Sequence, residues 1–568
     1  MCSERRVKEI LGIWVLSLCL VWVQNGVGVH SSSPTEESQP YRTGFHFQPP
    51  KNWINDPNGP MYFNGVYHLF YQYNPYGPLW GNISWGHSIS YDLVNWFLLE
   101  PALSPKEPYD INGCLSGSAT ILPGPRPIIL YTGQDVNNSQ VQNLAFPKNL
   151  SDPLLKEWIK WSGNPLLTPV DDIKAGQFRD PSTAWMGPDG KWRIVIGSEI
   201  DGHGTALLYR STNGTKWIRS KKPLHFSSKT GMWECPDFYP VTNGDKKGLD
   251  TSVQGNNTLH VLKVSFNSRE YYVIGTYDPI KDKFSVVTND FMVSNTQFQY
   301  DYGRYYASKS FYDSVNQRRV IWGWVNEGDS ESDAVKKGWS GLQSFPRSIW
   351  LSNNRKQLVQ WPVDEILKLR TKQVNITNRE LAAGELLKIP SITASQADVE
   401  VSFSLTNLTE IELIDSEVVD PQLLCAQKNV SISGKFGPFG MLILASKNLT
   451  EQTAVFFRVF KGPNKFLVLM CSDQSRSSIA QEVDKSIYGA FLDLDPLHEK
   501  IPLRSLIDHS IVESFGGEGI ACITSRVYPK LAINEQAELY VFNNGTQSVT
   551  MSTLNAWSMK RAQIVPIG

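Results

Sequence analysis

The stretch Val66-Tyr67-His68-Leu69-Phe70-Tyr71 is typical of the region that decides the fold. It is a short run of aromatic and branched aliphatic residues, which fit a pleated, half-buried surface well. Many short strands at fairly regular spacing predict a sandwich, a barrel or a propeller, and a region of this length favours a propeller. Similar runs, separated by turn formers, occur between about Tyr41 and Trp361 at Pro127-Ile128-Ile129-Leu130-Tyr131, Trp192-Arg193-Ile194-Val195-Ile196, Tyr271-Tyr272-Val273-Ile274-Gly275 and Val320-Ile321-Trp322-Gly323-Trp324.

The chain changes character after about Val374. Residues 399–405 alternate apolar with polar side chains, which indicates a strand with one buried face. Residues 539–545 join an apolar run to Asn-Asn-Gly, which is a hairpin signal. We therefore expect a second all-β domain, a sandwich, because 568 residues are too many for one ordinary core. The stretch 364–372 is predicted to be helical and to link the two domains.

Composition excludes several classes of protein. Hydrophobic residues make up 41% of the chain and charged residues 19%, which is a normal globular balance. The net charge is −1 without long runs of one sign, so binding of nucleic acid by a broad basic face has no support. The chain holds 18 Trp and 22 Tyr; aromatic residues at this level are explained by β-sheet packing, with stacking on sugar rings as the alternative.

The N-terminus resembles a secretory signal. Basic residues between Arg5 and Lys8 precede an apolar run, Ile10–Val23, and then small residues around Gly26. The run is short for a membrane span, so we expect cleavage rather than an anchor, and a mature chain outside the membrane. The expected organisation is a signal peptide at 1–28, a flexible segment at 29–44, the propeller at 45–362, a linker at 363–374 and the sandwich at 375–568.

Cysteines and glycosylation sequons fit secretion. Two of the seven cysteines, Cys2 and Cys19, leave with the signal peptide, and the remaining five have no metal-ligand spacing. One disulfide plus buried free thiols is the expected arrangement. Sequons for N-glycosylation occur at Asn82, Asn137, Asn149, Asn213, Asn256, Asn375, Asn407, Asn429, Asn448 and Asn544.

Three segments place a carboxylate in an unusual setting. Asp56 lies in Trp53-Ile54-Asn55-Asp56-Pro57-Asn58-Gly59-Pro60, where a turn-capping role is the simplest interpretation. Asp180 follows Arg179, which alone indicates a surface ion pair, and Glu234 lies in the aromatic segment Trp233-Glu234-Cys235-Pro236-Asp237-Phe238. Taken together, three such acids suit glycosidic bond cleavage, which needs a proton donor for the leaving oxygen and a second carboxylate at the sugar carbon.

The three segments resemble the signature motifs of glycoside hydrolase family 32, in the family order and over almost the whole mature chain. Plant acid invertases and fructan exohydrolases are the branch that is most similar. Further matching segments are Trp85-Gly86-His87-Ser88, Ser116-Gly117-Ser118-Ala119-Thr120, Tyr300-Asp301-Tyr302-Gly303, Lys337-Gly338-Trp339-Ser340-Gly341 and Asp508-His509-Ser510-Ile511-Val512-Glu513-Ser514-Phe515.

The resemblance implies a five-bladed β-propeller with the site in its central funnel, followed by a β-sandwich. It implies Asp56 as nucleophile, Glu234 as acid/base and Asp180 as transition-state stabiliser, with retention of configuration. It also implies a disulfide between Cys425 and Cys471. The reaction that it implies uses neither a metal nor a cofactor. The substrate pocket is expected to be lined by Trp53, Asn55, Gln72, Trp80, Leu115, Ser116 and Arg179.

The sequence departs from the invertase pattern in two places. Invertases typically carry an Asp and a Lys that organise the pocket for the glucose half of sucrose; the matching segment here, residues 260–272, is about two residues shorter and lacks both. Leu115 stands where the family commonly has Trp. Both departures spare the three acids and predict a fructan exohydrolase acting on levan- or inulin-type chains, with Leu115 favouring levan. The alternatives are a cell-wall acid invertase and a catalytically weak or non-enzymatic sugar-binding relative.

Location and assembly follow from the same features. Pro236 after Cys235 resembles the cell-wall group, so secretion to the apoplast or cell wall is expected, with the vacuole as the alternative. The expected partners are a fructan or sucrose substrate, without nucleic acid, and the chain is expected to be a monomer with highest activity at mildly acidic pH.

Overall fold

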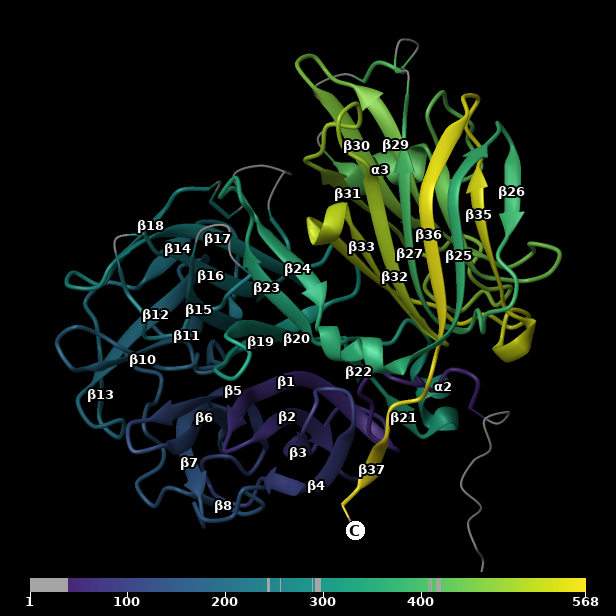
Figure 1. Cartoon of the computed structure of the whole chain (residues 1–568). Helices are drawn as coiled ribbons and strands as arrows, with labels where there is room; N and C mark the ends of the chain where they lie inside the picture. The colour runs from purple at the N-terminus through teal and green to yellow at the C-terminus, as the bar shows by residue number, and fades with distance from the viewer. Residues whose placement is uncertain are drawn as a thin grey trace, which may run out of the picture. The chain divides into compact units, whose positions relative to one another are not determined.

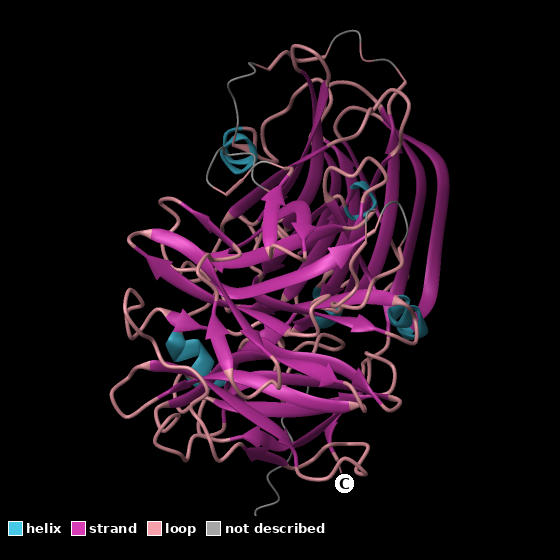
Figure 2. Cartoon of the chain, turned by 90° about the vertical axis from the view of Figure 1, so that its left-hand side faces the viewer, coloured by secondary structure: helices cyan, strands magenta, loops and turns pink. Residues whose placement is uncertain are grey.

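The computed structural model describes residues 39–567, except 243–245, 256, 289, 292–297, 407, 409–410 and 415–419. The predicted signal peptide, most of the predicted flexible segment and the sequons at Asn256 and Asn407 lie outside the described residues. The described chain is built almost entirely from strands (Figure 2). Its helices are the short α2 (Glu331–Lys337) and α3 (Pro421–Gln427) and the 3₁₀ turns η2 (Asp364–Leu369), η3 (Gly517–Gly519) and η4 (Asn534–Gln536).

Seven sheets are formed by the described residues, and the first five are the blades of a propeller (Figure 1). Along the main path of each blade the strands follow one another in chain order and pair antiparallel, so each blade is built on a meander. Blade 1 contains β1 (Asn52–Phe63), β2 (Val66–Asn74), β3 (Ser84–Ser90) and β4 (Trp96–Leu103). Blade 2 contains β5 (Gly113–Leu122), β6 (Arg126–Gln134), β7 (Gln140–Pro147) and β8 (Trp158–Lys160).

The remaining blades repeat this plan. Blade 3 contains β9 (Phe178–Arg179), β10 (Trp185–Met186), β11 (Trp192–Ile200), β12 (His203–Ser211), β13 (Trp217–Arg219) and β14 (His225–Ser227). Blade 4 contains β15 (Glu234–Val241), β16 (Leu259–Phe266), β17 (Arg269–Asp278) and β18 (Lys283–Val286). Blade 5 contains β19 (Tyr306–Asp313), β20 (Arg318–Val325), β22 (Leu342–Gln343), β23 (Arg347–Leu351) and β24 (Leu358–Pro362).

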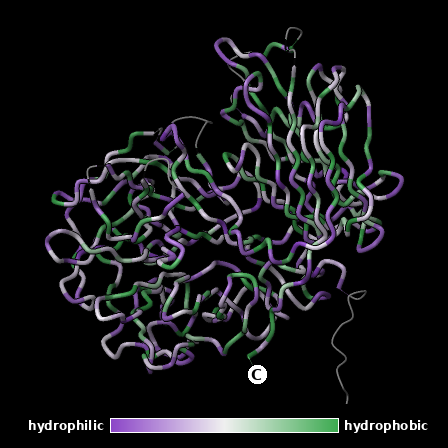
Figure 3. The backbone as a smooth tube through the Cα atoms, in the orientation of Figure 1, coloured by the Kyte–Doolittle hydropathy of each residue, from purple (hydrophilic) through white to green (hydrophobic). Residues whose placement is uncertain are grey.

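The last two sheets form the sandwich. One sheet has the order β25-β36-β27-β32-β33-β34 and the other β26-β35-β28-β29-β30-β31. Buried aliphatic and aromatic residues from both sheets make one apolar cluster, which is the core that holds the two layers together. Figure 3 shows hydrophobic and hydrophilic residues interleaved along the chain, as strands with one buried face require. The strands are β25 (Arg370–Leu381), β26 (Glu385–Lys388), β27 (Gln396–Ser404), β28 (Phe439–Ala445), β29 (Thr453–Lys461), β30 (Phe466–Asp473), β31 (Ile487–Leu492), β32 (Ile501–Asp508), β33 (Ile511–Gly516), β34 (Ala521–Arg526), β35 (Glu538–Asn543) and β36 (Val549–Met559).

Two short parallel pairings add strands to the two edges of blade 1. Strand β21 (Trp339–Ser340), which follows β20 in the chain, pairs with β1 and so joins the last blade to the first. Strand β37 (Ile564–Pro566) leaves the sandwich and pairs with β4. The predicted all-β fold, a propeller followed by a sandwich, is confirmed, but the C-terminal residues predicted to belong to the sandwich extend a propeller blade instead.

The ends of the predicted linker and of the flexible segment also differ from expectation. Within 363–374, η2 ends at Leu369 and the first sandwich strand, β25, begins at once. Residues 41–44 of the predicted flexible segment are hydrogen-bonded: the Tyr41 hydroxyl donates to the Pro529 carbonyl, and the Gly44 amide donates to Asp508. These contacts tie the start of the described chain to the sandwich.

A buried charge cluster joins the two domains. Asp508 in β32 accepts hydrogen bonds from the amides of Phe45 and His46 and from the His46 ring at 2.8–2.9 Å. Arg347 of blade 5 donates to Glu513 in β33 and to Asp301, both at 2.9 Å. All five side chains of this junction cluster are fully buried. The segment Asp508–Phe515 is therefore a domain-joining element.

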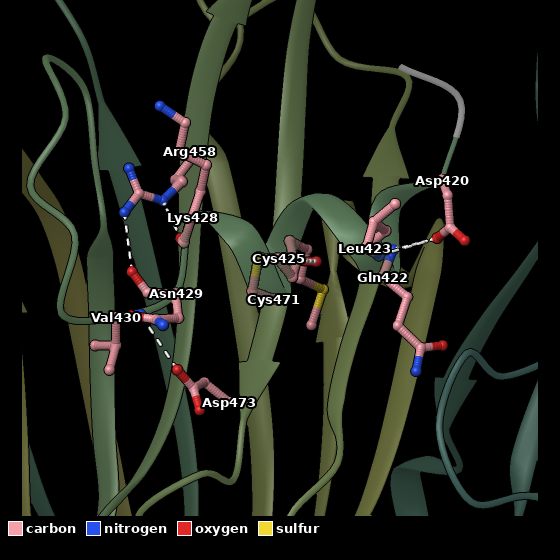
Figure 4. Close-up of a disulfide and its surroundings, with 11 residues drawn as sticks. Asp420, Gln422, Leu423, Cys425, Lys428, Asn429, Val430, Arg458, Cys471 and Asp473 are labelled. Atoms are coloured by element: carbon pink, nitrogen blue, oxygen red, sulfur yellow. Dashed lines mark hydrogen bonds between the residues drawn. A yellow bond between two sulfur atoms is a disulfide. The ribbon is translucent and has the colours of Figure 1, made fainter.

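The predicted disulfide between Cys425 and Cys471 is present (Figure 4). It connects α3 to β30 inside the sandwich. Asp420 caps α3 by accepting hydrogen bonds from the amides of Gln422 and Leu423, which fixes the helix that carries Cys425. Cys114, Cys235 and Cys522 are free and buried, so the expected combination of one bridge and buried thiols is confirmed.

Candidate active site

The innermost strands of four blades lose their pairing register near one end. In each case the inner strand has one residue more than its partner, which defines a β-bulge. A bulge turns side chains out of the regular alternation, and here it turns them away from the sheet. The shifts lie between Ile54 and Pro57 in β1, Cys114 and Gly117 in β5, Glu234 and Asp237 in β15, and Tyr306 and Lys309 in β19.

Blade 3 positions its candidate acid, Asp180, in a different way. Its inner strand β9 is only two residues long and ends at Arg179. Asp180 follows with φ of 66°, a left-handed conformation that is uncommon for a residue other than glycine. Cys235 and Ala307, inside the bulges of β15 and β19, also have positive φ, at 46° and 54°. Left-handed backbone is thus present at three positions beside the candidate residues.

Asp56 lies in a closed ring of hydrogen bonds that involves blades 1 and 2. The Asn55 amide donates to Gln72 at 2.7 Å and to one Asp56 oxygen at 3.0 Å. The Gln72 amide donates to the Ser116 hydroxyl, which in turn donates to the other Asp56 oxygen at 2.5 Å. This ring fixes the orientation of the Asp56 carboxylate through neutral donors.

Cys235 lies between Asp56 and Asp180. Its amide donates to Asp180 Oδ2 at 2.8 Å, and its Sγ lies 3.5 Å from the same oxygen and 3.6 Å from Asp56 Oδ2. Burial raises the pKa of the Cys235 thiol well above its usual range, and the two carboxylates add to this effect. The thiol therefore stays protonated and can donate to either acid. Thr132 accepts a hydrogen bond from the Asp180 amide and holds the backbone there.

Glu234 has two strong donors. Arg179 donates to Oε1 from Nη2 at 2.7 Å and from Nε at 3.2 Å. The phenol of Tyr306, in the bulge of β19, donates to Oε2. Burial and the charge of Glu234 raise the pKa of Tyr306, so the phenol remains a donor. Tyr306 was not identified from the sequence; its position three residues after Tyr300-Asp301-Tyr302-Gly303 was the available signal.

The carboxylates have shifted proton affinities. Burial, together with the charges of Asp180 and Glu234, raises the pKa of Asp56 to about 6, although the hydrogen bonds from Ser116 and Asn55 oppose the shift. Burial also raises the pKa of Asp180, partly offset by Arg179. Of the three acids, Glu234 accepts hydrogen bonds from Arg179, whose guanidinium also lies 4.0 Å from Asp180.

A buried lysine donates hydrogen bonds to the backbone of two of the bulges. Lys263 in β16 is fully buried, and its Nζ donates to the carbonyls of Cys235 at 2.7 Å and Ser308 at 2.6 Å. Its third partner is Glu270 at 3.2 Å, which also accepts from the Ser308 hydroxyl. Because those carbonyls belong to the bulges that carry Glu234 and Tyr306, Lys263 fixes the spacing between the two side chains.

Trp53, Trp80 and Leu115 are the other predicted pocket residues, and their place in the pocket stays a prediction. Trp53 donates from its indole to Asn55 at 2.8 Å and packs at 5.8 Å from the ring of Trp324. Trp80 lies in the loop between β2 and β3 and is 60% exposed. The Trp53 amide donates to Gly77 of the same loop. Leu115 lies half-buried in the bulge of β5.

The sequons differ in exposure. Asn82, Asn137, Asn149, Asn213, Asn375 and Asn448 are exposed. Asn429 and Asn544 are half-buried, and the Asn544 amide donates to the Val430 carbonyl at 3.0 Å. The glycosylation of all of them stays a prediction.

Within the described ranges, His, Cys, Asp and Glu side chains do not gather in groups of three or more that could hold a metal ion. The same residues include no helix long and apolar enough to cross a membrane. Two of the candidate acids, Asp56 and Glu234, lie in bulges of inner propeller strands and the third, Asp180, directly follows β9, an arrangement suited to acid–base and nucleophilic chemistry at a sugar carbon.

Comparison with known proteins places this site in a family. Residues 46–362 match the N-terminal domain of glycosyl hydrolases family 32, and residues 365–558 match the family's C-terminal domain. The chain therefore belongs to glycoside hydrolase family 32 and is a glycosidase of the β-fructofuranosidase type, as the sequence motifs indicated.

Proteins similar to this chain include both a cell wall β-fructofuranosidase and fructan exohydrolases. The cell wall isozyme of β-fructofuranosidase from Pisum sativum is 56% identical over 90% of this chain and 93% of its own length. The fructan 6-exohydrolase of Beta vulgaris is 56% identical over 93% of this chain and 88% of its own. The crystal structure of fructan 1-exohydrolase IIa from Cichorium intybus has a TM-score of 0.92 at 56% identity and covers 93% of this chain and 99% of that one. The Cichorium enzyme is also known in complex with 1-kestose.

Proposed function

We propose that this protein is a fructan exohydrolase, which releases terminal non-reducing β-D-fructofuranosyl residues from levan- or inulin-type fructans. The observation that carries the proposal is the hairpin of β16 and β17. It turns through Asn267 and Ser268, which have φ of 49° and 57°, the signs of a tight two-residue turn. So short a turn leaves no room for the Asp and Lys of the invertase pattern.

Arg269, the charged residue that directly follows this turn, contacts Tyr302 and the sandwich. Arg269 donates to the Tyr302 carbonyl at 2.7 Å and to Gln422 of the sandwich at 2.8 Å, and its guanidinium lies 5.9 Å from the ring centre of Tyr488. With one donor engaged by Tyr302 and another by Gln422 of the sandwich, Arg269 does not replace the missing pair. Recognition of a glucose unit is therefore expected to be weak, while the acids stay in place.

The proposed chemistry proceeds with retention. Ionised Asp56 attacks the anomeric carbon of the terminal fructose while Glu234 gives its proton to the leaving oxygen, which forms a fructosyl-enzyme. Glu234 then takes a proton from water, which attacks the same carbon and frees Asp56. Arg179 and Tyr306 orient Glu234, and Asp180 binds fructose hydroxyls as positive charge develops on the ring.

A cell-wall invertase is the second candidate. It is favoured by the Pisum sativum relative, which is as similar to this chain as the two fructan exohydrolases are. The name of that relative also supports our proposal that the protein is secreted to the cell wall.

Fructose release from sucrose, inulin and levan, measured in parallel at mildly acidic pH, separates the two candidates. We expect release from a polymer with little from sucrose, and the better polymer identifies the linkage. Rapid cleavage of sucrose with no release from either polymer would establish the invertase instead. The Glu234→Gln variant, purified in the same way, controls for contaminating host glycosidases.

The Leu115→Trp variant tests the second departure from the invertase pattern. Adding an aromatic ring to the bulge of β5 should lower the KM for sucrose severalfold and leave kcat on the polymer nearly unchanged, because no acid is moved. An unchanged KM for sucrose would mean that Leu115 does not determine the choice of substrate.

A further inference from the structure

An open cavity of about 660 Å³ lies at the outer part of blade 3, in the size range of small-molecule sites. Neither the proposed chemistry nor the terminal fructose pocket uses it. Its walls come from the β11–β12 turn, from β14 and the residues that follow it, and from the segment before blade 5. The lining residues that carry the argument are His203, His225, Phe226, Lys229, Asp290 and Phe291.

The cavity lies at the same end of its blade as the acids. Arg179 pairs with Gly197 of β11, and three residues further along, Ile200 pairs with His203 at the turn. Strand β14 is separated from β9 by three inter-strand steps, through β11 and β12. At about 4.8 Å a step, the cavity begins about 14 Å from Arg179. A disaccharide bound in the terminal pocket does not span that distance, whereas a longer chain does.

One wall of the cavity contacts the residue before the proposed acid. The His225 ring stacks on the fully buried Trp233, with 6.0 Å between ring centroids and 22° between planes. The Trp233 indole donates to Thr230 at 3.0 Å, which holds the segment between the cavity and Glu234. A lining residue of the cavity thus packs directly on the residue that precedes Glu234 in the chain.

The lining suits a neutral polyhydroxyl ligand. Phe226 is 57% exposed, an apolar ring face available for stacking on sugar C–H groups, and His203 meets its edge at 6.1 Å. The His225 Nε2 and an Asp290 oxygen lie 2.9 Å apart. The Asp290 carboxylate opposes an anionic ligand and can accept hydrogen bonds from hydroxyls, while Lys229 can donate them.

We propose that this cavity is a remote subsite that binds internal fructosyl residues of a long fructan chain whose end is being hydrolysed. The inference rests on the proposed fructan exohydrolase function and adds a preference for chain length. Longer chains gain affinity from the remote contact, and short ones do not reach it.

The test compares Phe226→Ala with wild type on fructans of increasing length, from a trisaccharide to inulin and levan. We expect the KM for the polymer to rise by about fivefold with kcat unchanged, the effect of losing one aromatic contact. The KM for the trisaccharide should not change. The matched control is Ile218→Ala, which removes a 74% exposed apolar side chain from β13 of the same blade and should alter neither KM. A change of equal size for trisaccharide and polymer, or no change for the polymer, overturns the subsite.

A binding measurement separates this inference from the proposed function. Calorimetric titration of inulin into the inactive Glu234→Gln protein measures affinity without turnover, and adding Phe226→Ala should weaken it by a similar factor. If the wild-type enzyme cleaves sucrose only, the proposed function is wrong. If, in addition, Glu234→Gln and Glu234→Gln/Phe226→Ala bind inulin with equal affinity, the subsite is wrong as well. If wild type cleaves fructans and that affinity is equal, the subsite alone fails.

Discussion

Two buried groups of carboxylates in this protein behave in opposite ways. At the domain junction, Asp508 and Glu513 face His46 and Arg347, and every charge has a partner of opposite sign within hydrogen-bond reach. Despite burial, the hydrogen bonds from His46 hold the pKa of Asp508 below its usual range, and the Arg347 charge does the same for Glu513. In the candidate site, burial instead raises the pKa of Asp56 to about 6.

The difference lies in what accompanies the acids. The described hydrogen-bond partners of Asp56 are Asn55, Ser116 and Cys235, all without positive charge. Burial without a cation raises the pKa of Asp56 and costs stability, whereas burial with a cation lowers the pKa of Asp508 and Glu513 and holds the domains together. Residue type alone does not set the proton affinity of a buried acid; its partners do.

The largest expected effect comes from removing the reactive acid. Asp56→Asn should lower kcat by more than about three orders of magnitude, since the nucleophile is lost. Its melting temperature at pH 7 should equal or exceed that of wild type, because a carboxylate with a raised pKa destabilises the fold when ionised. Calorimetry and fructose release check both points. A rate near that of wild type would exclude Asp56 as the nucleophile.

The junction cluster should show the reverse pattern. Arg347→Met leaves Asp301 and Glu513 buried without their cation, so we expect a loss of about 3 to 5 kcal/mol of stability. At a temperature where the variant stays folded, kcat should be close to that of wild type. A large loss of kcat with an unchanged melting temperature would contradict the assignment of this cluster to domain joining.

Lys263 tests whether a structural ion pair can also serve the site. Lys263→Met alone should destabilise the protein, because Glu270 is left unpaired. The double variant Lys263→Met/Glu270→Gln removes both charges and should recover much of the stability. Its kcat should still be about tenfold lower with KM little changed, since the carbonyls of Cys235 and Ser308 lack their donor. Full recovery of kcat would show that Lys263 only stabilises the fold.

The smallest expected effect is a shift of the pH profile. Ser116 donates to Asp56 and lowers its pKa, so Ser116→Ala should move that pKa above 6. Because Asp56 must be ionised to react, activity is lost as pH falls through this pKa, and the acid limb of kcat/KM should move to higher pH by less than about one unit. Ser118→Ala is the matched control, since Ser118 is buried on the same strand and its hydroxyl has no described partner. An acid limb that stays in place would show that Asp56 does not control it.

The sequence determined much of this protein. Runs such as Val66–Tyr71 specified strands through side-chain shape, their number specified a propeller, and the carboxylate segments specified the family. The positions of the disulfide cysteines also followed from the resemblance. The roles of the individual acids were predicted as well and stay predictions until the variants are measured.

Only the tertiary structure decided the rest, because it depends on which strands meet when the blades close. Bulges on separate inner strands brought Tyr306 against Glu234, 72 positions away in the chain. Next to the short β16–β17 turn, Arg269 donates a hydrogen bond to Gln422 of the sandwich. Strand β37, after the last sandwich strand, pairs with β4 of blade 1. Burial and charge partners gave Asp56 and Asp508 opposite pKa shifts. A linear sequence lists the charges; the distances between them, which set their energies, exist only after folding.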